Sequence, residues 1–182
     1  MINQIKQAYL SYGSNSCNET HITSFYINDN LNGKCSSSLT FKNATCFIEN
    51  VDKTEIDFVA IDDCLIAETT IQKCDALVTK GNIIWFIELK EIDQSGTRIQ
   101  FSKRKKNHRK KAVKQLASTI NDFKNKGINF TGFLVAGLIC FPPFPLLSMP
   151  TNIPTTSSQA RILEFQHLCG YTELHEGNYI SL

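Results

Sequence analysis

The sequence has no run of apolar residues long enough to form a membrane-spanning helix, which needs about 20 of them. The longest mostly apolar stretch covers only Ile128–Phe141, and Pro142, Pro143 and Pro145 follow it directly. The first residues, MINQIKQAYLSYG, contain no apolar segment of the signal-peptide type. We therefore expect a protein without a membrane segment, located in the cytoplasm.

Several metal- and nucleotide-binding motifs are also missing. No two of the seven cysteines form a CxxC pair, and neither HExxH nor GxxxxGK[ST] occurs. These absences argue against a zinc ribbon, a zinc metalloprotease and a P-loop nucleotide-binding protein. An odd number of cysteines in a cytoplasmic protein predicts reduced and mostly buried thiols.

Composition places the chain among ordinary globular proteins. It has 182 residues, 42% hydrophobic and 20% charged, and all five prolines lie in residues 142–154. This length predicts one domain, residues 1–182, with a proline-rich loop at 142–154. The patterns predict helices at 2–12, 107–126 and 157–169, and strands near 21–27 and at 45–49, 56–61, 71–79, 83–89, 130–140 and within 171–182. This order indicates an α/β fold, a three-layer sandwich in which helices flank a mixed central β-sheet.

Charge is distributed unevenly along the chain. Residues 1–100 carry 8 Lys and Arg against 13 Asp and Glu, whereas residues 101–182 carry 11 against 4. Eight of the basic residues fall within residues 103–114. Such a basic stretch favours a polyanionic partner, although a solvated helix face would also produce it.

The most informative segment is QKCDALVTKGNIIWFIELK, residues 72–90. Gly81 and Asn82 between two apolar runs predict a two-residue hairpin turn, which fixes the pairing of the strands. In that pairing Val78 faces Trp85, and Asp75 faces Glu88. Directly opposite side chains lie about 4.5–5.5 Å apart at Cβ, where like charges repel.

Two opposed carboxylates in an apolar hairpin need compensating positive charge. Lys90 shares a strand face with Glu88 and supplies one positive charge. A divalent metal ion would supply the rest, since such ions prefer oxygen ligands. A salt-bridged cluster in which both carboxylates pair with Lys90 is an alternative of about equal weight.

These residues resemble the core of the PD-(D/E)XK nuclease superfamily. Asp75 is followed after twelve residues by Glu88-Leu89-Lys90, with Cys74 in place of the usual proline. In that family the aspartate begins one strand, the (D/E)xK motif lies on the next, and a helix follows. The resemblance covers about residues 55–140 and implies a restriction-endonuclease-like fold.

The resemblance implies hydrolysis of phosphodiester bonds with Mg²⁺, or Mn²⁺ in vitro. Asp75, Glu88 and the backbone carbonyl of Leu89 would bind the metal, and Lys90 would position the attacking water. Gln115 on the following helix would be a further catalytic residue, although a surface glutamine is nearly as good an interpretation. Glu19 is the nearest candidate for an additional acidic residue, but it falls in irregular sequence. Nucleic acid would be bound by Lys103, Arg104, Lys105, Lys106, Arg109, Lys110 and Lys111.

The hypothesis is therefore a metal-dependent nuclease, with DNA as the favoured substrate. Because the chain has no room for a separate DNA-reading domain, specificity would come from loops, a homodimer or a partner protein. By analogy, such a nuclease suits the effector subunit of a bacterial defence or mobile-element system. The alternatives are a non-cleaving subunit of the same fold that binds nucleic acid or a partner, and a purely structural domain.

Overall fold

The structure is a computed structural model. It describes residues 1–182 apart from residue 15 and residues 31–33, 42–43, 91–96 and 142–155. The predicted proline-rich loop at 142–154 lies outside the described residues.

The centre of the fold is a mixed six-stranded sheet with the order β1-β5-β6-β7-β8-β9. The strands are β1 (Asn18–His21), β5 (Ile56–Ala60), β6 (Ala76–Lys80), β7 (Ile83–Leu89), β8 (Leu134–Cys140) and β9 (Glu173–Glu176). Strands β1, β5, β6 and β7 pair antiparallel, whereas β7, β8 and β9 are parallel. The carboxyl ends of β7, β8 and β9 therefore meet at one edge of the sheet.

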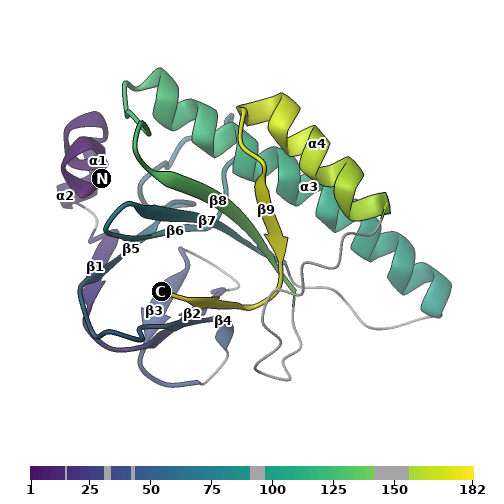
Figure 1. The fold of residues 1–182 in the computed structure, drawn as a ribbon, viewed down its shortest axis with the longest axis horizontal. Coiled ribbons are helices and arrows are strands. Elements are labelled where there is room, and N and C mark those ends of the chain that lie inside the picture. Colours follow the sequence, from purple (N-terminus) through teal and green to yellow (C-terminus); the bar gives the residue numbers. More distant parts are fainter. Residues whose placement is uncertain (15, 31–33, 42–43, 91–96, 142–155) are drawn as a thin grey trace.

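The helices cover one face of this sheet (Figure 1). They are α1 (Ile2–Ala8), the short α2 (Ser11–Ser14), α3 (Arg98–Asn125) and α4 (Thr156–Cys169). Ile5 of α1, Phe123 of α3 and Phe165 of α4 belong to one buried apolar cluster, together with Phe86 of β7. The predicted α/β combination of a mixed sheet and helices is confirmed.

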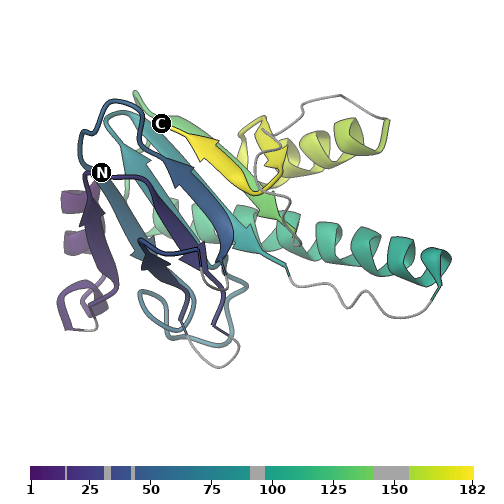
Figure 2. The ribbon, with the colours of Figure 1, turned by 90° about the horizontal axis from the view of Figure 1, so that it is seen from below.

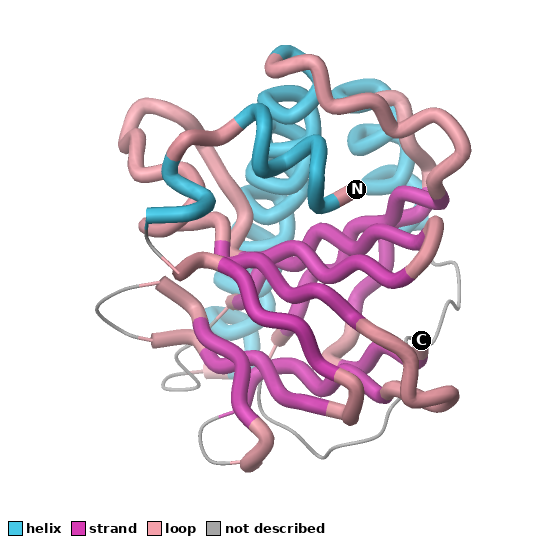
Figure 3. The backbone as a smooth tube through the Cα atoms, turned by 90° about the vertical axis from the view of Figure 1, so that its left-hand side faces the viewer, coloured by secondary structure: helices cyan, strands magenta, loops and turns pink. Residues whose placement is uncertain are grey.

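A second, smaller sheet covers the opposite face (Figure 3). Its order is β10-β4-β2-β3, formed by β2 (Phe25–Asn28), β3 (Ser36–Ser38), β4 (Ala44–Glu49) and β10 (Tyr179–Ser181). Ile27 and Ile48 of this sheet pack against Phe58 and Val78 of the central sheet. The three layers are thus helices, sheet and sheet, where we predicted helices for the outer layers.

Helix α3 begins nine residues earlier than its apolar stripe predicted. Thr97 forms a capping box with Gln100: the Thr97 side chain accepts from the Gln100 amide at 3.3 Å, and the Gln100 side chain accepts from the Thr97 amide at 2.9 Å. This reciprocal pair satisfies backbone amides that a helix start leaves unbonded. The basic stretch 103–114 therefore belongs to the helix, whose first turns extend beyond the sheet (Figure 2).

Other boundaries differ where short or polar elements weaken the pattern. The helix predicted at 2–12 is divided into α1 and α2. The described part of residues 13–40 contains three strands, where one was predicted. Strand β6 starts at Ala76 rather than at residue 71, and β8 starts at Leu134 rather than at residue 130. The last segment forms β9 and β10, which belong to different sheets.

The cysteines correct one prediction. Cys17 and Cys64 form a disulfide, so the expectation that all thiols are reduced is wrong. The fold brings them together because the Ala60 amide donates to the Cys17 carbonyl at 2.8 Å, just before the turn that carries Cys64. The other five cysteines are free and buried, as predicted.

Gly137 of β8 offers a test of the packing between the sheet and the helices. An added Cβ would lie 3.2 Å from both Leu174 Cδ1 and Phe165 Cζ and 3.3 Å from Leu116 Cδ1. Because these neighbours belong to three packed elements, we expect Gly137→Ala to reduce the free energy of unfolding by about 1–3 kcal/mol. Urea unfolding measures this, with Leu134→Ala at an exposed position of the same strand as the control. An unchanged free energy for Gly137→Ala would contradict the packing described.

Candidate active site

The hairpin of β6 and β7 forms with the predicted pairing. Gly81 has a φ of 56°, in the left-handed region that glycine readily adopts. Lys80 lies opposite Ile83, and Val78 lies opposite Trp85. The turn therefore sets which residues of the two strands meet at the far end of the hairpin.

The regular pairing ends just before Asp75. Ala76 pairs with Ile87, but the Asp75 amide then donates to the Ile87 carbonyl at 3.1 Å, so the ladder does not continue to an Asp75–Glu88 pair. The Asp75 side chain instead accepts a hydrogen bond from the Leu89 amide at 2.5 Å. The Asp75 carboxylate is thereby fixed beside the backbone that follows Glu88.

Glu88, Lys90 and Gln115 form a hydrogen-bonded group under helix α3. Glu88 is 1% exposed and Lys90 is 8% exposed. The Lys90 ammonium forms an ion pair with Glu88 Oε1 and donates to Gln115 Oε1 at 2.9 Å. Gln115 therefore points into the group that the sequence predicted and is not a free surface residue.

Helix α3 also holds the backbone that leads into Asp75. Gln115 Nε2 donates to the Lys73 carbonyl at 3.0 Å, and Thr119 Oγ1 accepts from the Cys74 amide at 2.8 Å. Gln115 and Thr119 are four residues apart, so they lie on the same helix face. These two bonds tie the start of the hairpin to the helix and position both carboxylates relative to Gln115.

Burial disfavours the ionised forms of the Asp75 and Glu88 carboxylates. Desolvation raises the pKa of Asp75 to about 7, against the lowering effects of the Leu89 amide and Lys90. Desolvation and then the charge of Asp75 raise the pKa of Glu88 well above its ordinary value, although Lys90 lowers it. The effect of the Asp75 charge on Glu88 indicates that the positive charge around Glu88 does not offset both carboxylates.

The residues present fit a divalent metal ion. Glu88 Oε2 is buried and has no hydrogen-bond partner among the described residues, although such an atom is costly to leave unbonded. No cluster of three or more His, Cys, Asp or Glu side chains able to hold a metal occurs in the described ranges. Mg²⁺ usually keeps several waters and binds through one or two carboxylates plus substrate phosphates, so two carboxylates are enough for it.

Three further charged residues near the site were missed by the sequence patterns. The charges of Asp29 and Asp62 contribute to raising the pKa of Asp75. Asp62 is itself paired with the buried Lys73 at 3.0 Å. Lys73 lies only two residues before Asp75 in the sequence, which is the one signal that could have identified it.

Glu19, the candidate for an additional acidic residue, lies on β1 and accepts a hydrogen bond from Ser37 at 2.6 Å.

The basic side chains of residues 103–111 on α3 have two kinds of environment: some are exposed to solvent, and others form ion pairs. The side chains of Lys103, Lys106, Lys110 and Lys111 are exposed. Lys105 and Arg109 instead form ion pairs with Glu176 of β9. Arg104 is half-buried. The predicted nucleic-acid-binding residues therefore include both exposed side chains and side chains that are paired with Glu176.

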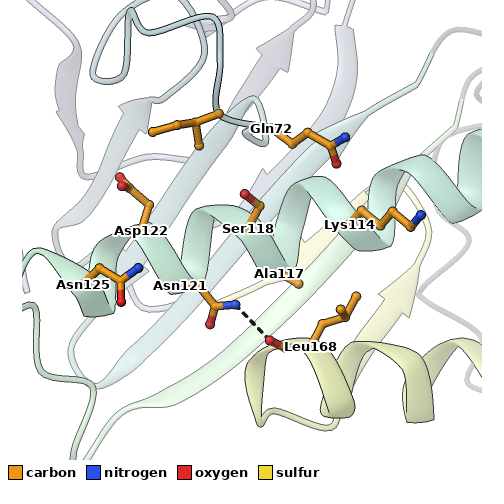
Figure 4. Close-up of a pocket in the computed structure, with 9 residues that line it drawn as sticks. Gln72, Lys114, Ala117, Ser118, Asn121, Asp122, Asn125 and Leu168 are labelled. Atoms are coloured by element: carbon orange, nitrogen blue, oxygen red, sulfur yellow. Dashed lines mark hydrogen bonds between the residues drawn. The ribbon is translucent and has the colours of Figure 1, made fainter.

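A separate pocket of about 460 Å³ lies along α3 (Figure 4). It is lined by residues that include Gln72, Lys114, Ser118 and Leu168. None of the predicted site residues lines it, so it does not contribute to the Asp75–Glu88 group.

Comparison with known proteins gave no match among family models, curated proteins or solved structures. Among the described residues, no helix has the length and apolar character needed to cross a membrane.

The raised pKa of Asp75 predicts how stability depends on pH without metal. A folded-state pKa of about 7 against an ordinary value of 3.8 means that the folded protein holds this proton more tightly than the unfolded chain. The contribution is fully present below about pH 4 and is lost as the pH rises through about 7. In EDTA at pH 8 we expect Asp75→Asn to raise Tm by a few degrees, with little change at pH 4.

Thermal unfolding across this pH range measures the effect. Asp52→Asn is the matched control, because the hydrogen bond from Lys80 lowers the pKa of Asp52 to about 2, so its loss should not raise Tm at pH 8. A Tm for Asp75→Asn equal to or below that of the wild type at pH 8 would show that Asp75 is adequately neutralised without metal.

Proposed function

We propose that this protein is a metal-dependent nuclease that hydrolyses phosphodiester bonds of nucleic acid, with DNA as the favoured substrate. The observation that carries the proposal is the group of Asp75, Glu88, Lys90 and Gln115, in which Glu88 and Lys90 are buried and Asp75 and Gln115 are half-buried. Within this group Glu88 Oε2 has no hydrogen-bond partner among the described residues, although Lys90 forms an ion pair with Oε1 of the same carboxylate. The comparisons do not supply a family, so the proposal depends on this geometry and on the resemblance of the motif.

The charge of the group favours metal binding over a structural salt bridge. Lys90 can neutralise one of the two carboxylates, and Lys73 is already paired with Asp62. When both are ionised, Asp75 and Glu88 together therefore carry more negative charge than Lys90 offsets, in a place where burial already raises their pKa values. A buried ion pair is tolerated only when the remaining charge is compensated.

Asp75 and Glu88 would bind Mg²⁺ or Mn²⁺, with the Leu89 carbonyl as a further ligand. Such an ion supplies Lewis acidity and lowers the pKa of a bound water. Lys90 would hold the attacking water or offset negative charge that develops on the phosphate. Gln115 would keep the Lys90 ammonium in place, since its Oε1 accepts from Nζ at 2.9 Å.

The order of elements supports a restriction-endonuclease-like core. Strands β5, β6 and β7 form an antiparallel meander, α3 follows, and β8 returns parallel to β7. The order of Asp75, the Glu88-Leu89-Lys90 motif and α3 agrees with the order expected from the resemblance, which supports the proposal. The small second sheet on the other face lies outside that core.

We further propose that a homodimer or a partner protein supplies specificity, as in an effector subunit of a defence or mobile-element system. A cytoplasmic location fits a nucleic-acid substrate and five free thiols. The Cys17–Cys64 disulfide is compatible with such a location because both residues are 1% exposed, which shields the bond from reductants.

Cleavage of a plasmid and of a labelled oligonucleotide in Mg²⁺ or Mn²⁺ tests the function. We expect cleavage that EDTA stops, and losses in kcat of about 10³-fold for Asp75→Asn and about 10²–10³-fold for Lys90→Ala. Gln115→Ala should lose about tenfold, because it removes a group that positions Lys90.

Lys126→Ala and Gln166→Ala are the matched controls, since both side chains are exposed, Lys126 lies eleven residues beyond Gln115 at the C-terminal end of α3, and Gln166 lies on α4. They should cleave like the wild type. Oligonucleotide binding in every protein, without cleavage in any of them, would reject the nuclease and favour the non-cleaving binding subunit.

A further inference from the structure

A second polar group lies in the same row across the sheet as Glu88. In the parallel ladders Glu88 is the partner of Ile139, and Ile139 is the partner of Glu176. Residues in one row of a parallel sheet project to the same face, and neighbouring strands are about 4.8 Å apart. Glu176 is therefore on the helix-covered face, about 10 Å from Glu88 along the row.

Glu176 is surrounded by three cations from two helices. Arg109 of α3 donates from Nε to Glu176 Oε2 at 2.7 Å and also contacts Oε1 through Nη2. Lys105 Nζ lies 3.5 Å from Oε1, and Arg161 Nη2 of α4 lies 3.7 Å from Oε2. Burial opposes the ionisation of Glu176, but the Arg109 hydrogen bonds and the other two cations outweigh it and lower its pKa. The ionised form of Glu176 is therefore favoured at this place.

The group has more positive charge than its internal ion pairs require. One carboxylate faces three cations, which leaves a net charge of about +2. Burial and the nearby charge of Arg109 lower the pKa of Arg161, which indicates that the two guanidinium groups repel each other. Lys105 and Arg109 also lie over the ring of Phe141, at 4.9 and 5.7 Å from its centroid. The ring and the carboxylate hold like charges together in one place.

The cations remain accessible to a ligand. The side chains of Lys105, Arg109 and Arg161 are 30%, 26% and 18% exposed. Arginine guanidinium groups bind phosphate oxygens through pairs of parallel hydrogen bonds, and two of them lie here.

We propose that Lys105, Arg109 and Arg161 form a binding site for a backbone phosphate of a nucleic-acid strand, with Glu176 as the anion that orders them in its absence. The inference rests on the proposed function, because it takes the strand that passes Asp75 and Glu88 as the ligand. At a rise of about 3.4 Å per nucleotide, 10 Å corresponds to about three nucleotides along the strand. The site would bind the strand near the bond to be cleaved without reading its sequence.

Glu176→Gln distinguishes this role from a purely structural junction. If phosphate competes with Glu176 for the cations, removing the carboxylate charge should tighten binding of a fluorescein-labelled oligonucleotide about 3–10-fold. Fluorescence anisotropy in EDTA, across a salt titration, measures binding without cleavage. A structural junction predicts instead that the variant lowers Tm and leaves the affinity unchanged or weaker, which would overturn the proposal.

Arg161→Ala and Lys105→Gln each remove a positive charge and should therefore weaken binding. This test is independent of whether Glu176→Gln folds. Each should weaken binding about 3–10-fold at 0.1 M salt and reduce the slope of log K against log salt by about one. Lys126→Ala is the matched control, since Lys126 is in an ion pair with Asp122 at the other end of α3, and it should bind like the wild type. Unchanged affinity in both cation variants would reject the site.

Two further outcomes distinguish a nucleic-acid strand from free phosphate, and this binding site from the proposed nuclease activity. Inorganic phosphate that displaces the oligonucleotide at millimolar concentration and constant ionic strength would show a site for free phosphate and overturn the assignment to a nucleic-acid strand. Since the binding assay contains no metal, its result does not depend on cleavage. Absence of cleavage with the predicted binding changes would reject the nuclease but keep this site, and normal cleavage without the binding changes would reject this site alone.

Discussion

The ion pair between Lys90 and Glu88 in a desolvated place is the interaction on which the candidate site depends. It satisfies one oxygen of Glu88 and leaves the other without a partner among the described residues. Asp75 adds a second carboxylate, whose oxygen is bound to the Leu89 amide. One lysine cannot neutralise two carboxylates, so the local chemistry favours a further cation.

The position of this interaction follows from the topology. Strands β7, β8 and β9 are parallel, so their carboxyl ends bring Glu88 and Glu176 to one edge of the sheet under α3. Helix α3 contacts both groups, through Gln115 at the first and through Arg109 at the second. Helix α3 therefore connects two groups of unlike charge. The group around Glu88 has too little positive charge, and the neighbouring group around Glu176 has an excess of it. This pairing would suit the proposed cleavage of a polyanion, with a metal ion held at the first group and a phosphate at the second.

The sequence predicted the parts of this arrangement that depend on local pattern. The Gly81-Asn82 turn fixed the β6–β7 register, and the apolar stripe located α3, so Glu88, Lys90 and Gln115 could be placed in one group. The pairing of Asp75 was less accurate, because the ladder ends at Ala76 and the side chain bonds to the Leu89 amide. Arg161 and Glu176 could not be found, since only the three-dimensional pairing of β8 with β9 and the packing of α4 on α3 bring them to Arg109. The small second sheet was missed because its strands are short and separated in the sequence, and the disulfide was missed because the cysteine spacing contains no pairing signal.

The central claim is that Asp75 and Glu88 share a divalent ion, and a crystal soaked in Mn²⁺ tests it most directly. The account predicts one anomalous difference peak between the two side chains, about 2.1 Å from a carboxylate oxygen of each, with Glu88 Oε2 among the ligands. A map without a peak there, in which Lys90 alone bridges the two carboxylates, would contradict it.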